Sequence, residues 1–88
     1  MADRHLLEIR DDVLTAHLPG EAVLLDLKTK RYYRLNATAA RIWRALEQSD
    51  EPSKIVEALV GEFAVDALTA RAELDRTLDD LRARGLVT

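Results

Sequence analysis

The side chains that most often carry catalysis are few in this chain, and their spacing does not suit it. There are two histidines and no cysteine in 88 residues. His5 and His17 are far apart and have no thiolate partner, whereas zinc sites normally use three or four ligands. Ser49 and Ser53 lie near a predicted helix start with no neighbouring base. We therefore expect neither a metal site nor a serine or cysteine nucleophile.

Carboxylates and glycines give no catalytic pattern either. Asp79 and Asp80 are adjacent on a predicted helix, so their side chains point about 100° apart and cannot converge on one bond. The three glycines are scattered and form no phosphate-binding loop. These patterns favour a binding protein that is not an enzyme and needs no cofactor.

Residue types suited to binding gather in one short segment. Tyr32 and Tyr33, the only tyrosines, stand between Arg31 and Arg34. Neighbouring strand residues point to opposite faces, so one ring is expected in the core and the other outside. Two interpretations fit the outer ring equally: a solvated tyrosine at the sheet edge, and part of a docking surface. If this strand lies at a sheet edge, its unpaired main-chain groups would accept an extended peptide, and its charges would discourage aggregation.

Strands and turns must position this segment. Val13–Leu18 alternates weakly and ends at the turn signal Pro19-Gly20. Glu21–Leu27 is apolar on both faces, which is typical of a central strand. The connection to Arg31–Leu35 lacks the residue pairs of two-residue hairpins, so we expect a longer loop with Lys30 in a strained or bulged position.

Three helices follow, and Trp43 lies on the apolar stripe of the first, where it is expected in the core. The first is predicted over about 37–47 after the cap Asn36, and the second begins at Asp50 or Glu51 before Pro52 and ends near Phe63 or Ala64. The third follows the cap Asp66 and stops at Gly85. The order predicts an α+β fold that is winged-helix-like, with a three-stranded antiparallel sheet followed by three helices. We expect one domain over residues 1–88: an extended N-terminal segment (1–12), the sheet (13–35) and the helices (36–85).

Charge is segregated along the chain although the net charge is only −3. The basic stretch without an intervening acid contains Lys28, Lys30, Arg31, Arg34, Arg41 and Arg44. Acidic residues gather near the start and along the last helix, so the total does not indicate nucleic-acid binding. No signal sequence or membrane span is recognisable, and we expect a cytoplasmic protein without a membrane partner.

Several stretches together resemble the PqqD-like family: VLLDLKTKRYYRLNATAARIW, KIVEALVGEFAVD and LDDLRARGLV. The resemblance runs from Val13 to the C-terminus. It is closest to free-standing leader-peptide recognition elements of lasso-peptide biosynthesis, which act with a separate cysteine protease that removes the leader. Lys30 departs from the glycine that many relatives have in the connection before the aromatic strand.

The resemblance implies that a precursor leader peptide, often with a Tyr-x-x-Pro element, adds as a strand along Arg31–Leu35 against the third helix. The macrocyclase of the pathway would be a further partner. The strand side of the implied leader site comprises Leu24, Lys30, Arg31, Tyr32, Tyr33, Arg34 and Leu35. The helix wall comprises Leu74, Asp75, Leu78, Asp79 and Arg82, although Leu78 fits an ordinary core position as well.

Two alternatives remain open at this stage. A small winged-helix DNA-binding protein would also combine strands, helices and a basic segment, although acidic residues on the third helix suit groove reading poorly. A homodimeric interaction module could instead pair the strand edge with its own copy.

Overall fold

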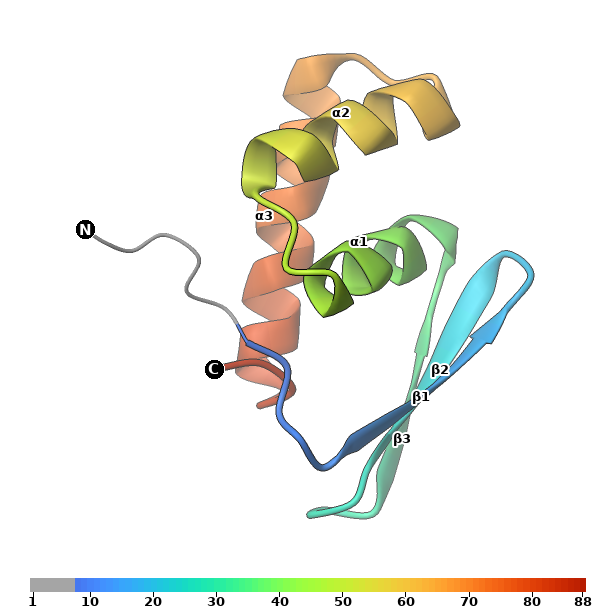
Figure 1. Ribbon diagram of the computed structural model, residues 1–88, viewed down its shortest axis with the longest axis vertical. Helices are drawn as coiled ribbons and strands as arrows, with labels where there is room; N and C mark the ends of the chain where they lie inside the picture. The colour runs from blue at the N-terminus through green and yellow to red at the C-terminus, as the bar shows by residue number, and fades with distance from the viewer. Residues whose placement is uncertain (1–7) are drawn as a thin grey trace.

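A computed structural model describes residues 8–88 and contains three strands followed by three helices (Figure 1). The strands are β1 (Val13–Leu18), β2 (Glu21–Asp26) and β3 (Arg31–Leu35), and the helices are α1 (Ala37–Glu47), α2 (Pro52–Phe63) and α3 (Ala67–Ala83). The predicted α+β architecture is confirmed. The part of the predicted N-terminal segment before residue 8 lies outside the described residues.

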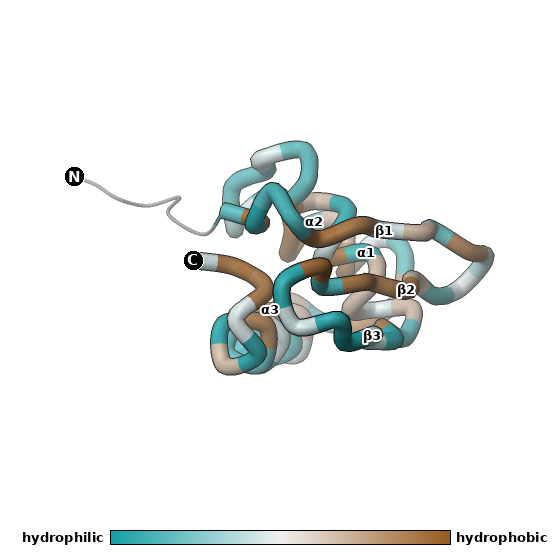
Figure 2. Tube along the Cα trace, turned by 90° about the horizontal axis from the view of Figure 1, so that it is seen from below, coloured by the Kyte–Doolittle hydropathy of each residue, from teal (hydrophilic) through white to brown (hydrophobic). Residues whose placement is uncertain are grey.

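The sheet is antiparallel with the order β1-β2-β3, so β2 is central as predicted. Gly20 has a φ of 72° in the β1–β2 turn, and Lys30 has a φ of 64° before β3, which confirms the expected strained position. The second strand ends at Asp26, one residue earlier than predicted, because the longer turn starts at Leu27. In Figure 2 the hydrophobic colour runs along β1 and β2, whereas β3 is largely hydrophilic.

Local capping sets the helix boundaries. The Asn36 side chain accepts a hydrogen bond from the Ala39 amide at 2.9 Å, and Asp66 accepts one from the Thr69 amide at 2.7 Å. The hydrogen bond from Thr69 lowers the pKa of Asp66 below its usual value, so this cap stays ionised. Each helix therefore begins where the sequence predicted.

A Schellman motif ends α3 at Gly85, which has a φ of 72°. The Leu86 amide donates to the Leu81 carbonyl at 3.0 Å, and the Gly85 amide donates to the Arg82 carbonyl at 3.0 Å. The motif turns the chain back, so that Leu86 packs beside Leu81 in the core.

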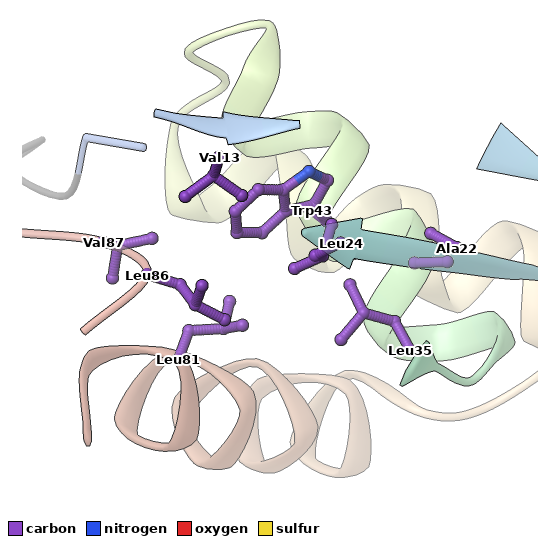
Figure 3. Close-up of a cluster of buried hydrophobic side chains, with 9 residues drawn as sticks. Val13, Ala22, Leu24, Leu35, Trp43, Leu81, Leu86 and Val87 are labelled. Atoms are coloured by element: carbon purple, nitrogen blue, oxygen red, sulfur yellow. The ribbon is translucent and has the colours of Figure 1, made fainter. Parts of the chain in front are cut away.

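The core has two clusters of buried side chains. The sheet cluster lies between the sheet, α1 and the end of α3, and consists of Val13, Ala22, Leu24, Leu35, Ala40, Trp43, Leu81, Leu86 and Val87. The helix cluster joins the three helices and consists of Ile42, Ala45, Ile55, Leu59, Ala70 and Leu74. Trp43 is fully buried, as predicted, next to Val13 and Leu24 (Figure 3), and its indole N–H donates to the Thr15 hydroxyl at 3.0 Å.

Within residues 8–88, no helix combines the length and the apolar character that crossing a bilayer requires.

Candidate functional site: a strand edge beside a helix

The outer side of β3 is a free sheet edge among the described residues, because β2 is its only partner strand. Hydrogen bonding alternates along antiparallel strands. Just beyond β1 and β2, the Leu27 amide donates to the Asp12 carbonyl at 2.9 Å. The odd-numbered residues of β2 therefore bond to β1, and residues 22, 24 and 26 bond to β3.

The same alternation decides which main-chain groups of β3 are available. The β3 residues opposite 22, 24 and 26 are Leu35, Tyr33 and Arg31, so these three complete the sheet. Tyr32 and Arg34 consequently direct their N–H and C=O groups outward. The free edge thus offers two donors and two acceptors with the spacing that an added strand requires.

A pocket of about 330 Å³ opens between the end of β3 and α3. Its lining residues are Arg34, Leu35, Asn36, Ala39, Glu73, Arg76, Thr77, Asp80, Leu81 and Arg84. Leu35 and the half-buried Ala39 contribute apolar surface, while charged side chains surround it. Arg34 and Leu35 belong both to this pocket and to β3, so an extended chain that pairs with β3 would lie beside the pocket and could place a side chain in it.

The two tyrosines have separate roles, as the alternation predicted. Tyr32 is on the outer face of the sheet and is 71% exposed, whereas Tyr33 is half-buried against the sheet cluster. The Arg84 guanidinium lies over the Tyr33 ring, 5.2 Å from its centroid. This cation–π contact connects β3 to the end of α3. Arg84 is also held by Asp80, with Nε 3.1 Å from the carboxylate.

The strand residues of the implied leader site differ in exposure. Arg31, Tyr32 and Arg34 are exposed, and Lys30 is an exposed turn residue just before the strand. Leu24 is fully buried beneath the sheet and cannot contact a ligand without rearrangement of the core. Arg34 donates to the carboxylate of Glu21 on the neighbouring strand β2 at 2.8 Å, and this hydrogen bond raises the pKa of Arg34, so its guanidinium stays charged.

The helix wall of the pocket differs from the sequence expectation. Leu74 is buried in the helix cluster and Leu78 packs against that cluster, so both face the other helices. Asp75, Asp79 and Arg82 do not line the pocket. The pocket instead uses the opposite flank of the apolar stripe on α3, with Glu73, Arg76, Thr77 and Asp80, followed by Arg84 beyond the helix.

The sequence offered a partial signal for these missed residues. Leu74, Leu78 and Leu81 mark an apolar stripe, and either flank of a stripe can face a neighbouring element. Arg84 follows the last helical residue and has no periodic signature of its own. Only the packed structure shows that it reaches Tyr33.

The arginines of α3 and its cap are each paired with an acid about one turn away. These ion pairs are Arg71–Asp75, Arg76–Glu73, Arg82–Asp79 and Arg84–Asp80. A helix that reads a DNA groove instead needs donors directed at phosphates and bases. The surface of α3 therefore suits a mixed-charge peptide or protein partner better than a polyanion.

Comparison with protein families gives one match over most of the chain. The family model described as "Coenzyme PQQ synthesis protein D (PqqD)" matches residues 21–87. This range contains β2, β3 and all three helices, and thus both walls of the pocket. A search of curated proteins found no significant match.

Two solved structures are similar over nearly the whole chain. One is TbiB1 in complex with the TbiA(beta) leader peptide, with 39% identity, a TM-score of 0.84, and coverage of 91% of this chain and 93% of that chain. The other is lasso peptide synthetase B1 complexed with the leader peptide, with 26% identity, a TM-score of 0.84, and coverage of 93% and 96%. Both of these relatives contain a bound leader peptide.

Proposed function

Starting from the premise that this chain belongs to the PqqD family, we propose that it is a non-catalytic adaptor that binds the leader of a ribosomally made precursor peptide. The leader adds to the sheet as a fourth strand beside β3 and places a side chain in the pocket against α3. The observation that carries this proposal is the free edge at Tyr32 and Arg34, which borders that pocket. The leader complexes of two similar structures support it.

The expected ligand follows from the chemistry of the edge and the pocket. Main-chain pairing supplies affinity with little dependence on sequence, and the pocket supplies selectivity for one or two side chains. A leader with a Tyr-x-x-Pro element suits this arrangement, because an aromatic ring can pack on Leu35 and Ala39. Leader residues beyond the pocket would meet the mixed charges of α3.

Alternating N-methylation of the ligand tests strand addition directly. The probe is a fluorescein-labelled TbiA(beta) leader peptide, with the leader from the organism's own precursor gene as a second probe. Methylation of amides that face β3 should weaken binding by about fivefold or more per site, because each loses a main-chain hydrogen bond. Methylation of the next amide of the leader, which faces away from β3, should change the affinity far less. Equal losses of affinity for both sets of methylated amides would reject this function, and so would equal affinity for a scrambled leader.

The second part of the proposal concerns the partner that acts on the leader. A separate cysteine protease would remove the leader while the adaptor holds it, which raises the local concentration of the cleavage site. The macrocyclase of the same pathway would then receive the released core peptide. Lasso-type biosynthesis is proposed because one of the two leader-bound relatives, which is similar over nearly its full length, is a lasso peptide synthetase B1.

Cleavage kinetics separate presentation from simple leader binding. The protease should cut the precursor faster in the presence of this chain, and excess free leader should abolish the gain. A matched precursor without its leader should show no gain. If cleavage is unaffected although the leader binds, the protease role is wrong and only leader binding stands.

A further inference from the structure

Arg10 connects two parts of the molecule that are distant in sequence. Its terminal nitrogens donate to the two carboxylate oxygens of Asp26 at 3.0 and 2.9 Å. One of these nitrogens also donates to the Gly85 carbonyl at 2.8 Å, and Nε donates to Asp12 at 3.0 Å. A planar guanidinium has donors in a fixed fork, so a single side chain can hold all three partners at once.

Asp26 stabilises the turn that leads into β3, the strand that forms one wall of the pocket. It is the only charged residue between positions 8 and 88 that is buried, with 1% exposure. Besides Arg10, its carboxylate accepts from the Lys28 amide at 2.9 Å, and its carbonyl accepts from the Lys30 amide at 2.7 Å. These bonds fix the turn from which β3 emerges. A buried carboxylate is costly unless it is paired, so Arg10 and the turn are needed together.

Gly85 anchors the helix wall. Its position is fixed to the end of α3 by the Schellman hydrogen bonds, and it directly follows Arg84, which lines the pocket. Two further contacts hold the same end of the chain: the Arg10 amide donates to the Leu86 carbonyl at 3.3 Å, and Ile9 forms a bridge with Val87.

We propose that Arg10 is a positioning residue that sets the separation between β3 and α3, and thereby leader affinity, without touching the leader. Arg10 does not line the pocket. It joins the turn before β3 to the residue after α3, at the end of the pocket where Arg84 covers Tyr33. Without this brace, the two walls would be held at that end by the cation–π contact, by apolar packing, and by the main-chain contacts of Ile9 and Arg10 with Val87 and Leu86. This inference rests on the proposed leader binding.

Arg10→Met tests the brace, and Asp12→Asn is the matched control. Methionine keeps part of the apolar stem of Arg10 but removes all of its hydrogen-bond donors. Asp12→Asn weakens only the contact between Arg10 and residue 12, which belongs neither to the turn before β3 nor to the end of α3. The native chain has no cysteine, so spin labels can be attached at Arg31→Cys and Arg82→Cys, both exposed. Electron–electron distance measurements without ligand then report the separation between β3 and α3.

We expect Arg10→Met to broaden or shift the interlabel distance and to weaken binding of the TbiA(beta) leader about tenfold. That change corresponds to a fall of the binding-competent fraction to about one tenth. Asp12→Asn should keep the distance and stay within about twofold in affinity. Both readouts are taken at a temperature where circular dichroism shows the variants fully folded, because lost stability alone would leave the distance within folded molecules unchanged.

Each outcome decides for or against the brace. Unchanged distance and affinity in Arg10→Met would overturn it, and so would weaker binding at an unchanged distance. If Arg10→Met does not fold, Arg10→Lys replaces it: one nitrogen in place of the fork should give an intermediate shift, and native behaviour would contradict the proposal. If the wild type binds no leader, the proposed function fails, while the ligand-free distance still tests whether Arg10 sets the gap.

Discussion

Replacing Arg34 with proline should remove one of the two outward main-chain donors of β3 and leave the sheet intact. The Arg34 amide points away from β2, because Leu35, Tyr33 and Arg31 are the residues that bond to that strand. Proline is tolerated on an edge strand when its missing N–H faces outward. Arg34→Pro therefore changes the edge that we propose for leader binding without breaking the β2–β3 ladder.

The magnitude follows from the number of groups on the edge. Tyr32 and Arg34 together offer two donors, so proline removes half of them and leaves a leader carbonyl without its partner. An unsatisfied group of this kind costs about 1–3 kcal/mol, which corresponds to a loss of about 5- to 150-fold in affinity. The Arg34 side chain also bonds Glu21, and Arg34→Ala controls for that exposed ion pair because it keeps the amide. We expect Arg34→Ala to stay within about threefold of the wild type.

Fluorescence anisotropy with labelled TbiA(beta) leader measures the three dissociation constants side by side. Thermal unfolding of each variant confirms that the comparison is made on folded protein. If Arg34→Pro binds as tightly as Arg34→Ala, the leader does not pair with this donor, and strand addition at β3 is refuted.

Three further predictions concern stability. Trp43→Phe loses the hydrogen bond to Thr15 and part of a buried ring, so urea unfolding should show a loss of about 1–3 kcal/mol, and an unchanged midpoint would contradict the packing described for α1. Lys30→Gly relieves a positive φ, so unfolding should show a gain of about 0.5–1 kcal/mol, whereas a loss would mean that the turn is not strained. The hydrogen bond from Arg10 lowers the pKa of Asp26 to about 2, below its value in the unfolded chain. The resulting stabilisation is present above about pH 4 and is lost as the pH falls towards 2. In Asp26→Asn, the free energy of unfolding should therefore depend less on pH between about pH 4 and 2. A pH dependence identical to that of the wild type would exclude this role for Asp26.

Element boundaries were readable from the sequence because the signals are local. Asn36 and Asp66 cap helices through bonds to amides three residues on, and Gly85 ends α3 through a conformation that glycine adopts readily. The apolar faces of β2 predicted a central strand, but the sequence offered the edge position of β3 only as a condition, and the strand order decides it. The family resemblance supplied the proposed partner, which no residue pattern in the chain gives by itself.

The ion pair between the half-buried Arg10 and the buried Asp26 was missed, although the sequence contained a signal for Asp26. Ala22, Leu24 and Asp26 share the inward face of β2, so a carboxylate at that place requires a cation. Nothing in the sequence indicates that Arg10, 16 positions earlier, supplies it. Such a pairing depends on the tertiary contacts that hold residues 8–10 beside residues 86–88.

The sequence by itself determined the strands, the helices, their caps and the apolar stripe of α3, because hydrogen bonds within a few residues and side-chain periodicity control them. The tertiary structure decided which flank of that stripe faces β3. Periodicity is symmetric about a stripe, so Asp75 and Asp79 on one flank looked equivalent to Glu73 and Asp80 on the other. The rotation of α3 is set by packing of Leu74 on the helices and Leu81 on the sheet. That rotation brings Arg84 over Tyr33, and long-range packing alone fixes it.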